Sequence, residues 1–251
     1  MGILNSKVAI VTGGGSGIGR EIAFKFAAEG AKVMVSDLNE DGGHQTVHQI
    51  KERKGVAAFF KANSAIATDS EKLVNETVSQ FGGLHIAVNN AGIGGPLVPI
   101  AEYPIDAWEK VLSINLSGVF YGMRYQIPAL LKSGSGGSIV NIASILGQVG
   151  FLNSGAYIAA KHGVVGLTQA AAVEYSAKGL RINSVGPGFI KTPLVEKSMS
   201  PEAMQALVKL HPIGRLGESA EVAELVLWLG SDKASFVTGA YYPVDGGYLA
   251  Q

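Results

Sequence analysis

The sequence predicts one α/β domain spanning residues 1–251, with a doubly wound parallel sheet of about seven strands and helices on both faces. Three observations support this fold. Short apolar segments rich in Val, Ile and Ala alternate with amphipathic segments of helical period along the chain. A glycine-rich segment directly follows the first apolar segment. The 251 residues, of which 47% are hydrophobic, suffice for one substantial core.

Composition narrows the class of ligand. Lys and Arg number 20, as do Asp and Glu, so the formal net charge is zero, and no long run of one sign occurs. This balance argues against a nucleic-acid partner or an anionic membrane surface. The absence of cysteine excludes disulfides, thiolate metal sites and a cysteine nucleophile. No stretch reaches the roughly 20 apolar residues of a membrane span and no leader is evident, so we expect a cytoplasmic protein with a small-molecule ligand.

The first βαβ unit is predicted over residues 7–36. Residues 7–11 (KVAIV) form a strand that ends at Thr12 and GGGSGIG, residues 20–29 form a helix stopped by Gly30, and residues 32–36 form the second strand. Asp37 follows, 18 residues beyond Gly19. This order is typical of a Rossmann-type dinucleotide site, in which helix N-terminal amides hold the pyrophosphate and the carboxylate accepts hydrogen bonds from the ribose.

The glycine spacing departs from G-x-G-x-x-G. Gly13, Gly17 and Gly19 stand instead in the pattern T-G-x-x-x-G-x-G. Taken alone, such a turn is equally a tight βα connection, and Asp37 a solvated strand end; their combination favours nucleotide binding. A carboxylate at Asp37 repels a 2′-phosphate, and positions 14–16, 38 and 39 hold no Lys or Arg, so NAD(H) is favoured over NADP(H).

The alternation continues to the end of the chain. Further helices are predicted over residues 39–54, 67–81, 108–131, 201–210 and 219–229, besides a long helix that contains residues 157–167. Further strands are predicted over residues 56–61, 84–88, 138–143, 181–185 and 241–244. Ligands of such sheets bind beyond the carboxyl ends of the strands. Functional residues should therefore gather just after positions 11, 36, 61, 88, 142 and 185.

Tyr157 and Lys161 stand four residues apart in the long helix. Side chains at this spacing are neighbours, about 5–6 Å apart at Cβ. A nearby ammonium favours the ionised phenol, so Lys161 can bring Tyr157 toward the range of a general acid and base. The alternative interpretation, which holds for many helices, is a packed ring beside a solvated charge.

Six motifs together resemble the short-chain dehydrogenase/reductase family. TGGGSGIG at 12–19, NNAG at 89–92, Asn115, Ser144, YIAAK at 157–161, and PG at 187–188 followed by Thr192 occur in the family's order and approximate spacing. The resemblance covers essentially the whole chain. Each motif is weak alone, whereas six in register indicate membership.

The resemblance implies a role for each candidate residue. Ser144 would hold the substrate oxygen, and Asn115 would anchor a water. Tyr157 would pass the proton, while Lys161 would bind the nicotinamide ribose and lower the tyrosine pKa. Considered apart from the resemblance, Asn115 is a buried amide with satisfied hydrogen bonds, and Ser144 is a turn residue at the end of a strand. No G-x-S-x-G motif surrounds Ser144, so the sequence does not mark it as a hydrolase nucleophile. The residues expected to bind NAD(H) are Gly13, Ser16, Gly17, Ile18, Gly19, Asp37, Leu38, Asn63, Ser64, Asn90, Ala91, Gly92, Tyr157, Lys161, Pro187, Gly188, Ile190 and Thr192.

Two regions are expected to adjust this general plan. Asn63-Ser64 stands where family members commonly carry an adenine-contacting aspartate, and the amide still offers a donor and an acceptor. Residues 189–214 correspond to the family's substrate lid. Together with Phe151, Leu152 and residues 94–96, the lid would enclose an apolar or aromatic alcohol or ketone. Its apolar members are Leu194, Val195, Met199, Met204 and Leu207.

We therefore expect an NAD(H)-dependent enzyme that interconverts a secondary alcohol and a ketone, assembled as the family's usual homotetramer. A 3-oxoacyl carrier-protein reductase shares the catalytic residues but is disfavoured by Asp37, since such reductases use NADPH. A nucleotide-binding protein without catalysis is disfavoured by the intact Ser144, Tyr157 and Lys161 set. No metal site is predicted, except that a related subgroup of alcohol dehydrogenases places its last residue, here Gln251, at a structural magnesium.

Overall fold

The computed structural model describes residues 2–134, 136–192 and 201–251. Its main feature is a seven-stranded sheet in the order β3-β2-β1-β4-β5-β6-β9, in which every neighbouring pair is parallel. This arrangement confirms the predicted fold class. The strands are β1 (Val8–Thr12), β2 (Lys32–Asp37), β3 (Val56–Lys61), β4 (Ile86–Asn89), β5 (Gly137–Ile142), β6 (Leu180–Pro187) and β9 (Tyr241–Val244).

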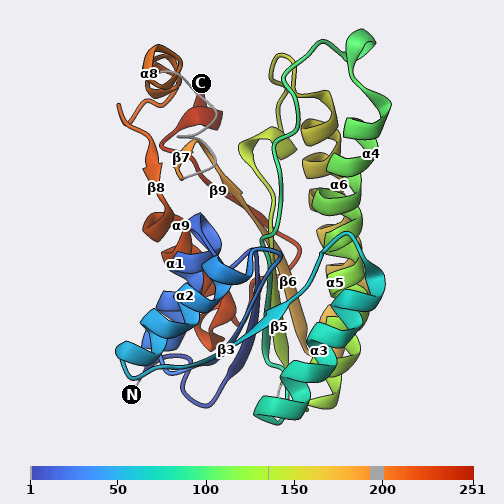
Figure 1. Cartoon of the computed structure of the whole chain (residues 1–251), viewed down its shortest axis with the longest axis vertical. Coiled ribbons are helices and arrows are strands. Elements are labelled where there is room, and N and C mark those ends of the chain that lie inside the picture. The colour runs from blue at the N-terminus through green and yellow to red at the C-terminus, as the bar shows by residue number, and fades with distance from the viewer. Residues whose placement is uncertain (1, 135, 193–200) are drawn as a thin grey trace.

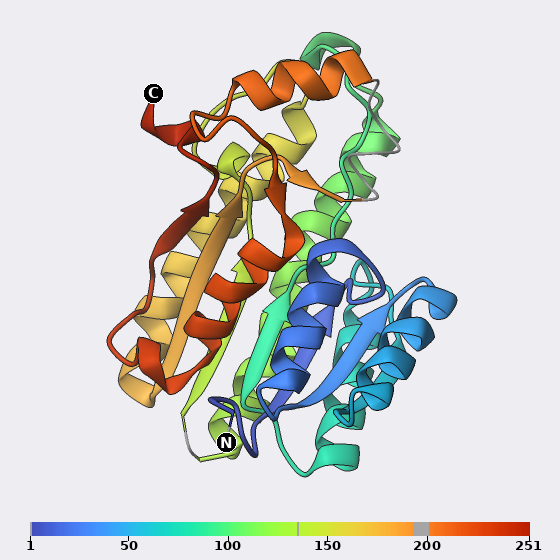
Figure 2. The same cartoon turned by 90° about the vertical axis from the view of Figure 1, so that its left-hand side faces the viewer.

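Helices cover both faces of the sheet (Figures 1 and 2). One face carries α1 (Gly17–Ala28), α2 (Glu40–Glu52) and α9 (Ser219–Gly230), and the other carries α3 (Ala67–Phe81), α5 (Gly118–Lys132) and α6 (Gly155–Tyr175). Successive strand residues face opposite sides. Accordingly, Ala9 and Val11 belong to the core beneath α1 and α9, whereas Ile10 belongs to the core beneath α5 and α6.

The long helix predicted over residues 108–131 begins earlier and contains a wider turn. It consists of α4 (Ile105–Leu112), a π-helical segment (Ser113–Ser117) and α5, and it follows Pro104 at its N-cap. The π turn includes Asn115. Such turns occur often at functional sites because one extra residue redirects the side chains around it.

Part of the chain that follows β6 lies beyond the carboxyl ends of the strands, at the top of the molecule in Figure 2. Two short strands, β7 (Ile190–Lys191) and β8 (Gly217–Glu218), pair in parallel and were not expected. Helix α8 (Pro201–Lys209) confirms the helix predicted within the lid region. Three of the lid residues named above, Leu194, Val195 and Met199, lie outside the described residues. Across the described ranges, no helix combines the length and apolar character needed to cross a bilayer.

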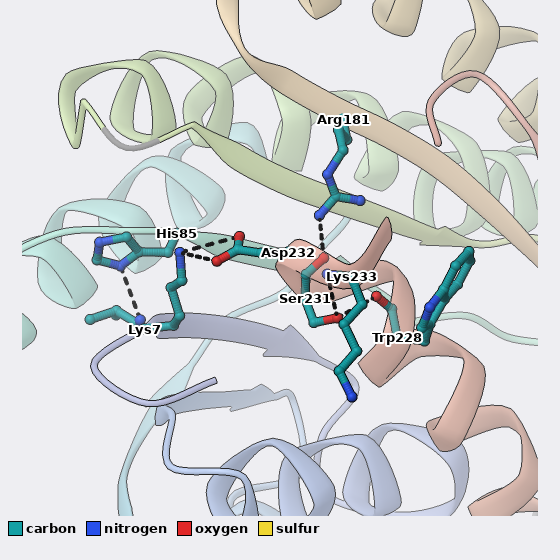
Figure 3. A network of polar contacts seen from close by, with 8 residues as sticks. Lys7, His85, Arg181, Trp228, Ser231, Asp232 and Lys233 are labelled. Atoms are coloured by element: carbon teal, nitrogen blue, oxygen red, sulfur yellow. Dashed lines mark hydrogen bonds and ion pairs between the residues drawn. The ribbon is translucent and has the colours of Figure 1, made fainter. Parts of the chain in front are cut away.

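Polar contacts tie the amino-terminal ends of the strands together (Figure 3). The Val8 amide donates to Nδ1 of His85 at 3.0 Å, which joins β1 to the segment before β4. Arg181 at the start of β6 donates to the carbonyls of Leu229 and Ser231 at 2.7 and 2.9 Å. The end of the sheet opposite the predicted site is thereby fixed to the carboxyl end of α9.

Candidate active site

A cleft of about 540 Å³ runs along the carboxyl ends of the strands. Most of the predicted site residues line it, although they come from seven separate parts of the chain. They are Gly13, Ser16, Gly17, Ile18, Asp37, Leu38, Asn63, Ser64, Asn90, Ala91, Gly92, Ser144, Tyr157, Lys161, Pro187, Gly188, Ile190 and Thr192. Gly19 and Asn115 are absent from the cleft wall and lie behind it.

The glycine-rich turn places the start of α1 against the cleft. Gly13 and Gly17 have φ values of +63° and +51°, in the left-handed region that favours glycine. A Cβ atom on Gly19 would lie 2.2 Å from the Gly13 carbonyl oxygen and 2.5 Å from Nδ2 of Asn90. Gly19 therefore permits close packing rather than contacting a ligand. The backbone amides in the first turn of a helix have no hydrogen-bond partner within the helix, so they are well suited to bind a phosphate.

Asp37 is held at the end of β2 by two backbone amides. Its Oδ2 accepts from Gly15 at 2.9 Å and its Oδ1 accepts from Asn39 at 2.9 Å. Arg20 donates to the Gly15 carbonyl, to Gln45 and to Thr46, outside the residues that line the cleft. The carboxylate thus lines the cleft, and the described residues that line it with Asp37 include no arginine that could receive a 2′-phosphate.

Thr12 and Asn90 join the glycine turn to the end of β4. Thr12 Oγ1 accepts from the amides of Asn90 and Ala91 at 3.0 and 3.2 Å. Nδ2 of Asn90 donates to the carbonyls of Thr12 and Gly13 at 3.0 and 3.2 Å. Thr12 was not among the expected site residues, although its place in the first motif is a usable signal. At the end of β3, Oδ1 of Asn63 accepts from the Ala65 amide at 3.0 Å, which shapes the turn next to the cleft.

Ser144, Tyr157 and Lys161 lie together in the wall of the cleft. Ser144 follows β5 and is 7% exposed; its Oγ accepts from the Leu146 amide at 3.2 Å, and its side chain is hydrogen-bonded to Tyr157. Lys161 is 4% exposed, donates from Nζ to the Ile142 carbonyl at 2.8 Å, and lies 5.5 Å from the centroid of the Tyr157 ring. The predicted common face of Tyr157 and Lys161 is confirmed.

Burial dominates the electrostatics of this group. It raises the pKa of Tyr157, and the hydrogen bond with Ser144 opposes that rise. Desolvation of the phenolate is the larger of these two effects on the Tyr157 pKa. The expected lowering of the Tyr157 pKa by Lys161 stays a prediction. Burial also lowers the pKa of Lys161, from 10.5 to about 8.

Asn115 is fully buried beneath the segment that follows β4. Its Oδ1 accepts from the Ile93 amide and its Nδ2 donates to the Ile93 carbonyl, both at 2.8 Å. A Cβ on Gly92 would lie 3.2 Å from Oδ1 of Asn115 and 3.8 Å from Nζ of Lys161. Asn115 therefore holds the backbone that separates it from Lys161. Its expected role as a water anchor stays a prediction.

The part of the cleft away from Asp37 is largely apolar. Its lining includes Ile93, Leu97, Ile145, Leu146 and Phe189. Phe151 and Leu152, which were expected to border the cleft, do not line it. The ring of Phe151 packs against Phe189 with centroids 5.6 Å apart, and the side chain of Leu152 is largely exposed.

His211 supports Phe189 from behind. Its Nδ1 pairs with the Leu207 carbonyl at 2.8 Å in α8, and its Nε2 accepts from the Phe189 amide at 3.3 Å. Tyr248 packs on both rings, 5.6 Å from His211 and 6.0 Å from Phe189. Helix α8 and the end of the chain thus meet behind one cleft residue.

The end of the chain contacts protein groups. Nε2 of Gln251 donates to the Leu210 carbonyl at 2.8 Å, just beyond α8. Among the described residues, no group of three or more His, Asp or Glu side chains is placed to hold a metal ion.

Comparison with known proteins agrees with this geometry. The family model described as enoyl-(acyl carrier protein) reductase matches residues 13–249. Cyclohexanol dehydrogenase of Acinetobacter sp. (strain SE19) is 51% identical over 98% of this chain and 96% of its own length. Levodione reductase of Leifsonia aquatica is 40% identical, over 97% of this chain and 94% of its own.

Solved structures extend the likeness to three dimensions. A crystal structure of levodione reductase superposes with a TM-score of 0.96 at 39% identity, covering 98% of this chain and 99% of that one. Carveol dehydrogenase from Mycobacterium avium, solved in complex with NAD, gives a TM-score of 0.96 at 29% identity with full coverage of both chains. From its family-model match, its relatives and its fold, the chain belongs to the short-chain dehydrogenase/reductase family of oxidoreductases.

Proposed function

We propose that the protein interconverts an apolar, cyclic secondary alcohol and the corresponding ketone with NAD(H). The carrying observation is the Ser144–Tyr157–Lys161 group, which stands between the Asp37 end of the cleft and its apolar half. The relatives named above act on cyclohexanol and levodione, which supports a ring-shaped substrate.

The residues present fit NAD(H). The amide end of α1 and Gly13 suit the pyrophosphate, and the carboxylate of Asp37 suits the hydroxyls of the adenosine ribose. Asn63 and Ser64 suit the adenine, and Lys161 suits the nicotinamide ribose. When bound, the cofactor accepts or supplies the hydride, and the protein orients the reactants.

Proton transfer belongs to Tyr157 in this proposal. Because burial raises its pKa, the phenol is protonated at neutral pH, the form that gives a proton to the oxygen of a ketone. Ser144 donates a hydrogen bond to the same oxygen as charge develops on it. In the oxidative direction the phenolate takes the alcohol proton, and the buried ammonium of Lys161 stabilises that phenolate.

The test compares Tyr157→Phe with Tyr175→Phe, a variant at the far end of the same helix. NADH absorbance would be followed with cyclohexanol and cyclohexanone, with linear alcohols, and with a 3-oxoacyl thioester. We expect turnover of the cyclic pair, a loss of at least about 100-fold in Tyr157→Phe, and wild-type rates in Tyr175→Phe. Equal rates for wild type and Tyr157→Phe would contradict the assignment. Preference for the thioester would instead favour a 3-oxoacyl carrier-protein reductase. If none of the substrates is turned over, the result would favour a nucleotide-binding protein without catalysis.

The proposal includes a cytoplasmic homotetramer. Large apolar side chains are exposed along α4, α5 and α6, where Ile105, Phe120 and Val173 are 77%, 47% and 86% exposed. Phe236, before β9, is fully exposed. Exposed apolar groups on two sides of a molecule favour two separate subunit interfaces. Light scattering after gel filtration should give a mass of four chains, whereas a monomer at micromolar concentration would contradict the tetramer.

The cytoplasm is proposed as the location of the protein because NAD(H) is reduced and reoxidised there.

A further inference from the structure

The side chain of Tyr241 reaches the backbone of Ser144 across the edge of the sheet. Tyr241 is the first residue of β9, and its hydroxyl donates to the Ser144 carbonyl at 2.9 Å. The same carbonyl accepts from the Gly147 amide at 2.9 Å. A carbonyl oxygen has two lone pairs, so both are occupied, one from the local turn and one from a distant strand.

The sheet is built to admit this ring. Tyr241 pairs with Ser184 of β6, next to which Figure 1 shows β9. A Cβ on Gly186 would lie only 1.9 Å from the Tyr241 hydroxyl oxygen and 2.2 Å from Cζ. Glycine at 186 is therefore what leaves room for the phenol. Burial raises the pKa of Tyr241, with Asp245 adding to the effect, so the hydroxyl keeps its proton and remains a donor.

The contact fixes the residue that points into the cleft. Ser144 stands between the end of β5 and a 3₁₀ turn (Ile145–Gly147), with extended backbone at φ −175° and ψ 162°. Its Oγ already accepts from the Leu146 amide, which leaves the hydroxyl proton for the side of Tyr157. Rotation of the Ser144 peptide would move Oγ relative to Tyr157, and the phenol of Tyr241 opposes that rotation from outside the turn.

We propose that Tyr241 is a positioning residue for Ser144 and acts on catalysis only through it. The inference rests on the proposed function, in which Ser144 steadies the substrate oxygen. Loss of one neutral hydrogen bond of this kind corresponds to about a three- to tenfold effect on an equilibrium or a rate. Tyr241 should therefore influence kcat moderately, while NADH binding at the far end of the cleft stays unchanged.

The experiment is a double-mutant cycle of Tyr241→Phe and Ser144→Ala. Tyr242→Phe is the matched control, because the Tyr242 ring packs against Trp228 with centroids 6.4 Å apart, away from Ser144. kcat and KM would be measured with a cyclic ketone and NADH, together with the thermal midpoint. We expect Tyr241→Phe to lower kcat about three- to tenfold with an unchanged KM for NADH, and to have no further effect in the Ser144→Ala background.

A second variant tests the same contact from the other side. Gly186→Ala displaces the ring but keeps the phenol, so it should reproduce the kcat loss of Tyr241→Phe. Two results would overturn the inference: a wild-type kcat in Tyr241→Phe, or the same loss of kcat from Tyr241→Phe in the wild-type and the Ser144→Ala backgrounds. Either result leaves the proposed function standing if Ser144→Ala itself lowers kcat. Wild-type kcat in Ser144→Ala would overturn the proposed role of Ser144 itself.

Discussion

Replacing Lys161 by methionine should raise stability near neutral pH while removing activity. Methionine has a similar length and no charge. The lysine side chain is 4% exposed, and burial lowers its pKa from 10.5 to about 8. The difference between the two pKa values corresponds to about 3 kcal/mol. Burial of the charged ammonium lowers the free energy of unfolding of the wild-type protein by this amount. The lost hydrogen bond to Ile142 offsets about 1.5–3 kcal/mol, so a net gain of about 1 kcal/mol remains.

The pH dependence gives a sharper measure. Below pH 8 lysine is protonated in both states, so the full penalty applies; above pH 10.5 it is neutral in both, and the penalty disappears. Wild type should therefore gain stability relative to Lys161→Met as the pH rises through this window. Between pH 7.5 and 10, the difference in free energy of unfolding should change by about 2 kcal/mol.

Urea titrations followed by tryptophan fluorescence, at one protein concentration, would measure these differences. Lys178→Met, at an exposed lysine near the end of α6, is the control and should show no such pH dependence. NADH-linked turnover of Lys161→Met should fall by at least about 100-fold. A constant stability difference from pH 7.5 to 10 would refute the reasoning that burial penalises this ammonium.

Three further predictions concern the cofactor end and the base of the sheet. Asp37→Ser should raise kcat/KM for NADPH relative to NADH by about tenfold or more, since it removes the repulsive carboxylate; an unchanged ratio in steady-state assays would contradict this. Gly19→Ala should weaken NADH binding at least about tenfold in fluorescence titrations, because its Cβ overlaps the Gly13 carbonyl oxygen at 2.2 Å, whereas Gly166→Ala, with nothing within 4 Å, should bind normally. Burial and Lys7 lower the pKa of His85, so its contribution to stability should be lost as the pH falls below about 6.5. His85→Asn keeps an acceptor for the Val8 amide, and its thermal midpoint should fall less steeply with decreasing pH than that of the wild type. An equal fall in both proteins would exclude His85 as the source of this pH dependence.

Most of the fold was predictable because it follows from local patterns. Most strands are short apolar segments and most helices have an apolar stripe, and this alternation predicts a parallel sheet with crossover helices. The π turn at Asn115 was not predictable, since one inserted residue leaves the surrounding apolar spacing almost unchanged. The two-residue strands β7 and β8 are too short to carry a periodic signal.

The candidate site divides in the same way. The residues of the glycine turn, Asp37, and the pair Tyr157 and Lys161 were predictable from spacing, because each signal lies within one βα unit or one helix. The balance of effects on the Tyr157 pKa was not, since desolvation depends on everything packed around the ring. The support of Phe189 by His211 and Tyr248 likewise joins segments that no local pattern connects.

The last residues of the chain have a practical significance. Gln251 donates a hydrogen bond to the carbonyl that follows α8, and Tyr248 packs behind Phe189, so the last residues of the chain support the wall of the cleft from behind. The chain begins at the opposite end of the molecule, beside the starts of the strands (Figure 2). A purification tag or fluorescent fusion appended after Gln251 therefore risks altering substrate affinity, whereas one placed ahead of the first strand leaves the chemistry undisturbed.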